Sequence, residues 1–94
     1  MTDATSQAVD AVVRTAYGRL LSCLAAEHRD LAGAEDALGD AIERALRTWP
    51  ETGVPRRPEA WLLTVARRRM IDRHRHRAVA ERAEPTLQLQ KVFH

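Results

Sequence analysis

Apolar residues recur along the first part of the chain at spacings of three and four, the period of an α-helix. In this first segment they are Val9, Val12, Val13, Ala16, Tyr17, Leu20, Leu21 and Leu24. They predict an amphipathic helix from Ala8 to about Ala26 or His28. Residues 1–7 are polar and are expected to be a disordered N-terminus. Gly18 interrupts the helix, which favours a close crossing with another helix at that point.

A second apolar face follows Asp30, whose carboxylate can accept a hydrogen bond from a free backbone N–H and so cap a helix. Its apolar positions are Leu31, Ala34, Leu38, Ala41, Ile42, Ala45, Leu46 and Trp49. Its charged positions are Glu35, Asp36, Asp40, Glu43, Arg44 and Arg47. Proline interrupts helices, so Pro50 is expected to end this one, and the predicted bounds are about 31–49.

Residues 50–58 contain three prolines and a glycine. They predict a stiff loop, because proline fixes its own backbone angle. Pro58 suits the first turn of a third helix, and Glu59 lies favourably near the positive end of that helix. The apolar part of this helix consists of Trp61, Leu62, Val65, Ala66 and Met70, with Ile71 beside them. The helix is expected to continue through Arg77 and as far as Ala83.

Together these segments predict one all-α domain, a small bundle of three to four helices. Ninety-four residues are enough for a single domain. We expect residues 8–83 to form it and residues 84–94 to be a linker or terminal tail. Cys23 lies among apolar residues and is expected in the core. No apolar run could span a membrane and nothing resembles a signal peptide, so the expected location is cytoplasmic.

Charge is distributed unevenly along the chain. Residues 27–51 contain seven acidic residues and three arginines, a balance of −4, whereas residues 56–77 contain eight arginines and two acidic residues, a balance of +6. An acidic segment followed by a basic one predicts two different partners, one of them a polyanion. Arginine suits a polyanion because its planar fork binds phosphate and stacks on bases.

The basic part of the third helix reads Arg67-Arg-Arg-Met-Ile-Asp-Arg-His-Arg-His-Arg77 and follows an apolar start, Trp61-Leu-Leu-Thr-Val-Ala66. Such a column of cations could neutralise several phosphates, with strong dependence on salt. An aromatic side chain beside a stiff, arginine-bearing loop is a means of stacking unpaired bases. We therefore predict binding to single-stranded nucleic acid at this helix.

Other chemistry is not indicated by the sequence. His74 and His76 are two positions apart on a helix and would point to different sides, whereas helical metal ligands are usually four apart. His28 and His94 are isolated. There is no glycine-rich phosphate loop and no nucleophile next to a histidine. We expect no catalytic residue, no metal and no cofactor, and therefore no enzyme.

Four segments carry a family resemblance. They are Ala34-Glu-Asp-Ala-Leu-Gly-Asp-Ala-Ile-Glu-Arg-Ala-Leu46, Trp49-Pro50, Pro58-Glu-Ala-Trp-Leu-Leu-Thr-Val-Ala-Arg67 and Ile71-Asp-Arg73. In this order and spacing they resemble region 2 of bacterial sigma factors of the extracytoplasmic-function class. The resemblance covers about residues 8–80. The Trp-Pro pair followed by a Gly-Val-Pro loop is most similar to the subgroup with long C-terminal extensions.

The resemblance implies a transcription initiation factor domain that binds core RNA polymerase and recognises and melts the promoter −10 element. It implies that the clamp helices of the largest polymerase subunit contact Asp36, Asp40, Glu43 and Arg44. It implies that a loop at about 52–58, containing Arg56 and Arg57, captures a flipped base. The third helix would then face the separated strands through Trp61, Val65, Arg68, Arg69, Asp72 and Arg73. Capture of an extruded base favours open DNA over the paired duplex.

The sequence departs from the family pattern at two places. Gly39-Asp40 stands where members commonly have Gln-Glu, and Arg68 stands where many have asparagine, so the preferred base does not carry over. No region 4 follows His94, and the chain is therefore expected to be part of a larger factor or a truncated one. An anti-sigma factor, or a C-terminal domain of the same protein, is a further expected partner.

Two other interpretations of the residues remain open. One is a helical protein–protein interaction module whose arginines are merely solvated. The other is a helix-turn-helix protein that reads duplex DNA. That motif needs two helices joined by a short turn, which the proline loop fits poorly.

Overall fold

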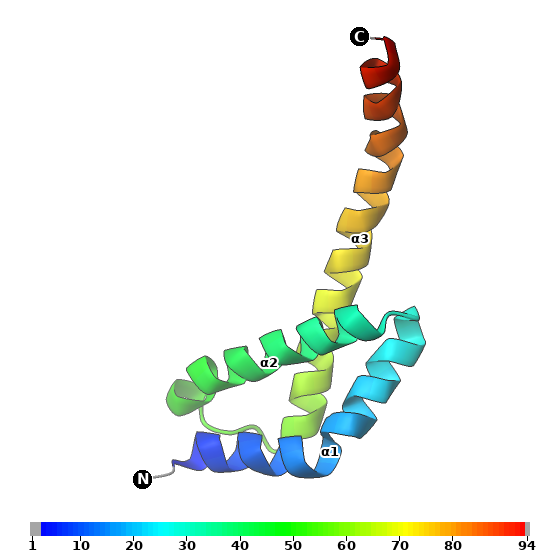
Figure 1. The fold of residues 1–94 in the computed structure, drawn as a ribbon. Coiled ribbons are helices and arrows are strands. Elements are labelled where there is room, and N and C mark those ends of the chain that lie inside the picture. Colours follow the sequence, from blue (N-terminus) through cyan, green and yellow to red (C-terminus); the bar gives the residue numbers. More distant parts are fainter. Residues whose placement is uncertain (1–2, 94) are drawn as a thin grey trace.

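The computed structural model describes the backbone of residues 3–93 and the side chains of residues 3–82. Within these residues it has three helices and no strand: α1 (Ala4–His28), α2 (Leu31–Thr52) and α3 (Pro58–Phe93). Each helix packs against the other two, and α3 continues beyond the point where α2 crosses it (Figure 1). The predicted all-α fold is confirmed.

Helix α1 begins earlier than its apolar pattern predicts. The Asp3 carboxylate accepts a hydrogen bond from the Ser6 backbone N–H at 2.7 Å and caps the helix. The next turn is anchored because Thr5 is only 4% exposed. Residues 4–7 are therefore helical, where a disordered N-terminus was expected. The apolar period alone could not show this, since the anchoring residue is a threonine.

Helix α1 changes direction about midway along its length (Figure 1). In its central part the Thr15 hydroxyl donates to the Ala11 carbonyl at 2.7 Å, a bond that often bends helices. A Cβ atom on Gly18 would meet nothing within 4 Å. The expectation that Gly18 serves a close helix crossing is therefore wrong. The bend lets one half of α1 reach the end of α2 and the other half reach its beginning.

The turn between α1 and α2 is closed at both ends. Arg29 adopts a left-handed conformation (φ 52°), and its N–H donates to the Ala25 carbonyl. Asp30 caps α2 as predicted, accepting a hydrogen bond from the Gly33 N–H at 2.9 Å. A Cβ atom on Gly33 would lie 2.2 Å from the Asp30 carboxylate. Glycine at position 33 is therefore what lets this cap sit close to the helix.

Gly33 and Gly39 are expected to respond in opposite ways to alanine. A Cβ on Gly39 meets nothing within 4 Å, so Gly39→Ala should raise the free energy of unfolding by about 0.5–1 kcal/mol through helix propensity alone. Gly33→Ala gains the same propensity but displaces the Asp30 cap, which costs about 1 kcal/mol or more. Urea unfolding followed by circular dichroism measures both. A stabilised Gly33→Ala variant would contradict the cap geometry.

Helix α2 was expected to end at Pro50. It continues instead to Thr52, with the proline inside its last turn. Proline lacks a backbone N–H and so removes one helical hydrogen bond. Close to the helix end this loss disturbs few further hydrogen bonds. The helix closes when the N–H of Gly53, which has a φ of 89°, donates to the Trp49 carbonyl at 2.8 Å. The Thr52 hydroxyl donates to the Thr48 carbonyl at 3.1 Å.

The core lies where the three helices meet. Its buried residues are Val9, Val12, Ala16, Leu20, Leu24, Ala34, Ala37, Leu38, Ala41, Ala45, Trp49, Leu62, Val65, Ala66 and Met70. Four residues of the predicted apolar faces are not in it: Leu31, Leu46 and Val13 are 57%, 45% and 42% exposed, and Cys23 is exposed, with its thiol donating to Glu27. Tyr17 is partly buried against the core. Alanines on the buried side of α2 allow close packing, which leaves the flanking positions outside.

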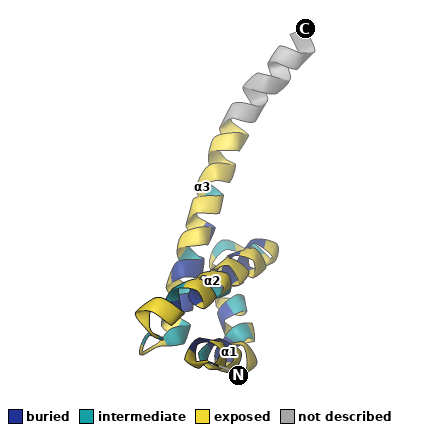
Figure 2. Cartoon of the chain, turned by 90° about the vertical axis from the view of Figure 1, so that its left-hand side faces the viewer, coloured by how far each residue is buried: buried dark blue, intermediate teal, exposed yellow. Residues whose placement is uncertain are grey.

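Helix α3 begins at Pro58, as predicted. Its last buried residue is Met70; the described residues after it are exposed, apart from the half-buried His74 (Figure 2). The helix runs to Phe93 instead of ending near Ala83, so the backbone of 84–93 continues the third helix. The segment is rich in strong helix formers. No helix of the described part of the chain is long and apolar enough to cross a membrane.

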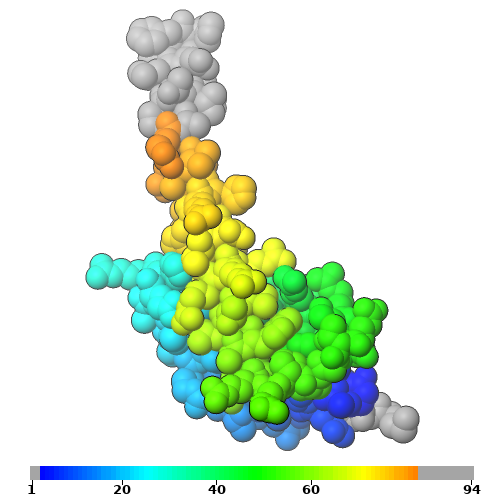
Figure 3. Space-filling view, turned by 180° about the vertical axis from the view of Figure 1, so that it is seen from behind, coloured from blue at the N-terminus to red at the C-terminus, as the bar shows by residue number. Residues whose placement is uncertain are grey.

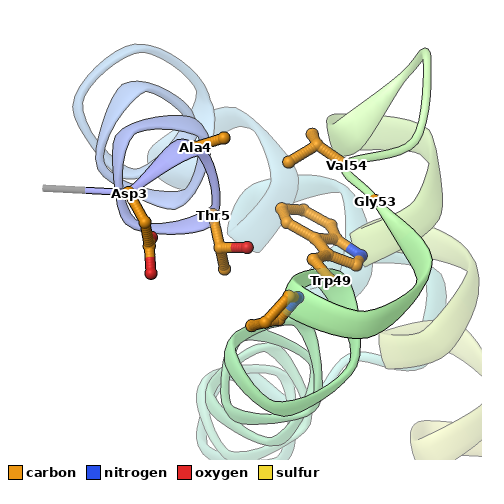
Figure 4. A pocket seen from close by; sticks show the side chains of 7 residues that line it. Asp3, Ala4, Thr5, Trp49, Gly53 and Val54 are labelled. Atoms are coloured by element: carbon orange, nitrogen blue, oxygen red, sulfur yellow. The ribbon is translucent and has the colours of Figure 1, made fainter.

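Trp49 joins the end of α2 to the loop and to α3. Its side chain is only 2% exposed and lies between the start of α1 and the loop, beside a pocket of about 360 Å³ (Figure 4). The Trp61 ring packs edge-to-face on it, with the ring centroids 5.2 Å apart. Trp49 Nε1 is buried and has no hydrogen-bond partner within residues 3–82. The contact between Trp61 and the buried Trp49 thus fixes the beginning of α3 against the core.

Candidate nucleic-acid interface

The arginines of α3 divide into those that hold other helices and those that do not. Arg67 belongs to the first group: its guanidinium donates two hydrogen bonds, at 3.0 and 2.7 Å, to the Glu27 carboxylate of α1. This bidentate contact lowers the pKa of Glu27 and raises the pKa of Arg67, because it favours the charged form of each group. The Arg67 guanidinium therefore serves a contact between α3 and α1.

A second set of contacts joins α3 to the beginning of α2. Arg73 donates to the Asp36 carboxylate at 3.0 Å. His74 Nε2 and Arg77 lie 3.4 and 3.9 Å from the Asp30 carboxylate. The pKa of Asp30 is lowered, first by the Gly33 N–H that it accepts and then by Arg77 and His74.

Two residues of this region make contacts that the sequence did not indicate. His28, which seemed isolated, stacks on His74 with ring centroids 5.0 Å apart. Arg73, which the resemblance places on DNA, is 42% exposed and tied to Asp36, one of the residues that the resemblance places on polymerase. A contact that links the two expected interfaces could not be found from the sequence, because the residues are 37 positions apart.

Five other arginines of the 56–77 segment are exposed and have no ion pair with another described residue: Arg56, Arg57, Arg68, Arg69 and Arg75. Arg56 and Arg57 lie in the loop immediately before α3. The other three lie on the helix itself. Because unpaired cations attract anions more strongly than paired ones, this second group is the candidate anion-binding set.

One side of α3 combines these unpaired cations with aromatic and apolar groups. Residues spaced by three and four fall on one side of a helix, and here they line three adjoining hollows of about 370, 170 and 310 Å³. We call this surface the Trp61 stripe; it consists of Trp61, Val65, Arg68, Asp72, Arg75, His76 and Val79. Seen from behind, α3 runs uncovered across the molecule, between α1 and α2 (Figure 3).

The structure gathers most of the residues that the sequence predicts for DNA. Trp61, Val65, Arg68 and Asp72 lie on the stripe, and Arg69 lines its middle hollow. Arg57 lines a separate hollow of about 320 Å³ at the first turn of α3. Glu59, in that same turn, forms an ion pair with Arg19 of α1. Arg56, Arg57 and Arg73 do not lie on the stripe: the first two are in the loop, and Arg73 donates to Asp36 of α2.

One of the four residues predicted to bind polymerase also borders α3. Asp36, Asp40 and Glu43 are exposed, and their spacing of four and three places them on one side of α2. Asp40 and Glu43 form no ion pair with another described residue. Arg44, by contrast, lines two hollows together with Val65 and Arg68 of α3. Its place next to the buried Ala41 and Ala45 is the sequence signal that could have revealed this.

No group of three or more His, Cys, Asp or Glu side chains among residues 3–82 is arranged to hold a metal ion. The site contains a half-buried tryptophan, the valines of the stripe and several guanidinium groups without an ion pair to a described residue. Such a surface can stack bases and neutralise phosphates.

Comparison with known proteins places the chain in a family. Residues 7–79 match the family model described as sigma-70 region 2. An uncharacterized protein of Rhizobium meliloti (strain 1021) is 39% identical over 70 residues, which are 74% of this chain and 16% of that relative. The chain thus spans less than a fifth of the length of the curated relative. No solved structure matches it.

Proposed function

Because the chain belongs to the sigma-70 region 2 family, we propose that it is the part of a transcription initiation factor that binds core RNA polymerase and recognises and melts the promoter −10 element. Its role is binding and strand separation, not catalysis. The observation that carries this proposal is the Trp61 stripe, where unpaired arginines and an aromatic ring share one uncovered side of α3.

Strand separation on such a surface does not require ATP hydrolysis. Phosphate contacts are available from single and paired strands alike, whereas a ring such as Trp61 gains stacking energy only from an unpaired base. Base stacking on a protein aromatic contributes about 1–3 kcal/mol per base, comparable with the cost of unstacking one step of the duplex. The bound single strand is then favoured over the duplex by its contacts alone.

The loop that carries Arg56 and Arg57 is proposed to capture a flipped base. Val54 and Pro55 are half-buried, and Val54 packs against the core, so the first part of the loop is held in place. A loop that is already ordered loses little entropy on binding. The two arginines project from it next to the first turn of α3.

Single-stranded DNA should bind more tightly than duplex of the same sequence. A fluorescent oligonucleotide containing a −10-like segment, titrated with the chain as a single strand and after annealing, measures both affinities. We expect a preference on the order of tenfold, since one stacked base contributes about 1–3 kcal/mol. Trp61→Ala should reduce this preference and leave most of the salt dependence. Equal affinities for the two forms of DNA would refute the proposed melting.

Polymerase is proposed to dock on the acidic side of α2. Of its residues, Asp40 gives the cleaner test, because Asp36 also holds Arg73 within the fold. Asp40→Lys should weaken binding to core polymerase about tenfold or more, since like charges at an interface are costly. Glu35→Lys is the matched control, because Glu35 is an exposed acidic residue of the same helix that does not share the three-and-four spacing of Asp36, Asp40 and Glu43. Competition against a labelled sigma factor measures both, and equal losses would contradict the assignment.

We further propose that the chain belongs to the extracytoplasmic-function class and acts in the cytoplasm. The class rests on the Trp49-Pro50 pair, the loop after it and the Pro58-to-Arg67 segment. An anti-sigma factor or a C-terminal domain of the same protein is a further proposed partner.

The alternative, a protein–protein interaction module, gains support from one observation. Arg67, Arg73 and Arg77 all serve contacts between helices, so part of the basic segment has a structural explanation. The unpaired arginines discriminate between the two functions, because only the nucleic-acid function needs their charges.

A further inference from the structure

Arg44 of α2, which the family resemblance groups with the acidic residues of that helix, forms no ion pair with any of them in the described range. It lines the hollow of about 370 Å³ with Trp61, Thr64 and Arg68, and also the adjoining one of about 170 Å³ with Arg69 and Asp72. Both hollows therefore have walls from two helices. The seam beside them is made of small buried residues, Ala41 and Ala45 of α2 and Ala66 of α3, which allow two helices to approach closely.

The charges at this seam are not balanced. Three guanidinium groups, from Arg44, Arg68 and Arg69, face one carboxylate, from Asp72. Neither Arg44, Arg68 nor Arg69 forms an ion pair with any residue in the described range. Cations brought together without partners repel one another and attract an anion. The surplus of two positive charges fits the phosphates of a nucleic acid strand.

The remaining lining explains why the ligand would be an unpaired strand. The larger hollow has both apolar and polar lining: Trp61 is half-buried, Val65 is buried, and the Thr64 hydroxyl already donates to the Ala60 carbonyl at 2.8 Å. An aromatic ring beside guanidinium groups suits a base with its phosphate next to it.

On the basis of the proposed function, we infer that Arg44 is a nucleic-acid-binding residue: together with Arg68 it forms a clamp, built from α2 and α3, around the backbone of the unpaired strand at Trp61. The strand would thus be held by two helices rather than by α3 alone. The polymerase surface of α2 would consist of its acidic side without Arg44.

Arg44→Gln tests the clamp, and Arg47→Gln is its matched control. Both are exposed arginines of α2 and both variants lose one charge, but Arg47 lines neither hollow. The probe is a short fluorescent single-stranded oligonucleotide titrated with the full chain at several salt concentrations. Arg44→Gln should weaken binding about tenfold and lower the salt slope by about 0.7, the value for one phosphate contact on a single strand. Arg47→Gln should change the affinity less than about twofold.

Two results would overturn the clamp. One is an equal, small effect of the two variants. The other is an Arg44→Gln variant that binds the oligonucleotide normally and loses affinity for core polymerase. Failure of the unsubstituted chain to bind single strands would refute the proposed function itself, which separates the two failures. Arg44→Lys, which keeps the charge, should retain the salt slope.

Discussion

Replacing Trp49 with alanine is expected to produce the largest loss of stability of any single substitution in this chain. Trp49 is the largest fully buried side chain, and it lies where α1, α2 and the loop meet. Removing a buried tryptophan side chain typically costs about 3–5 kcal/mol, from lost burial and the cavity that remains. That is a large part of the total stability of a small domain, about 5–15 kcal/mol. Urea unfolding followed by circular dichroism measures the change.

Trp61→Ala is the matched comparison for this prediction. Trp61 is half-buried and rests on Trp49 edge-to-face, so its removal should cost clearly less stability. The Trp61→Ala variant should nevertheless remain folded and bind single strands more weakly. Trp49 is buried and is not expected to contact the bound strand itself. If Trp61→Ala unfolded the domain as readily as Trp49→Ala, its assignment to the binding surface would lose its support.

Charge reversal of Arg68 and Arg69 together is expected to produce the largest loss of binding. Both are exposed, line the same hollow and have no ion pair with a described residue. Hydrogen bonds to charged groups contribute about 1.5–3 kcal/mol each, so Arg68→Glu with Arg69→Glu should lower the affinity for single-stranded DNA on the order of 100-fold. The salt slope should fall by about 1.4, for two phosphates. Fluorescence polarisation over a range of salt concentrations measures both quantities.

The control for this pair is Arg29→Glu with Arg47→Glu. It makes the same change in net charge at two exposed positions outside the hollows, and it should weaken binding only through general electrostatics. If the two double variants lose affinity equally, binding depends on net charge rather than on the Trp61 stripe. If neither loses affinity and a protein partner is still bound, the interaction-module interpretation is favoured.

Much of the fold follows from local rules. The apolar spacing in the first segment predicts α1, the Asp30 side chain predicts the start of α2, and Pro58 predicts the start of α3. These signals are reliable because a cap or a proline acts within one turn of the residue that carries it. The wrong predictions also arise from relying on local patterns. Apolar spacing gives no weight to Thr5, and it counts Leu31 and Leu46 as core although the alanines of α2 leave them exposed.

Less of the candidate site could be predicted. The basic composition of α3 and the position of Trp61 indicate nucleic acid, but eight arginines in the 56–77 segment look alike in a sequence. Which of them are occupied depends on acids far away in the chain: Glu27 holds Arg67 across 40 residues, and Asp36 holds Arg73 across 37. Helix packing alone decides such pairs, because only packing brings those side chains within reach.

By itself, the sequence determined the three helices, the stiff loop between the second and third, and the presence of a cationic helix with an aromatic residue at its start. Periodicity, caps and prolines are local properties, and charge density can be counted. Only the tertiary structure decided which arginines of residues 3–82 are left without ion-pair partners and that Arg44 lines a hollow together with Arg68. Those outcomes depend on the rotation and closeness of packed helices, which arise from the burial of side chains distant in the chain.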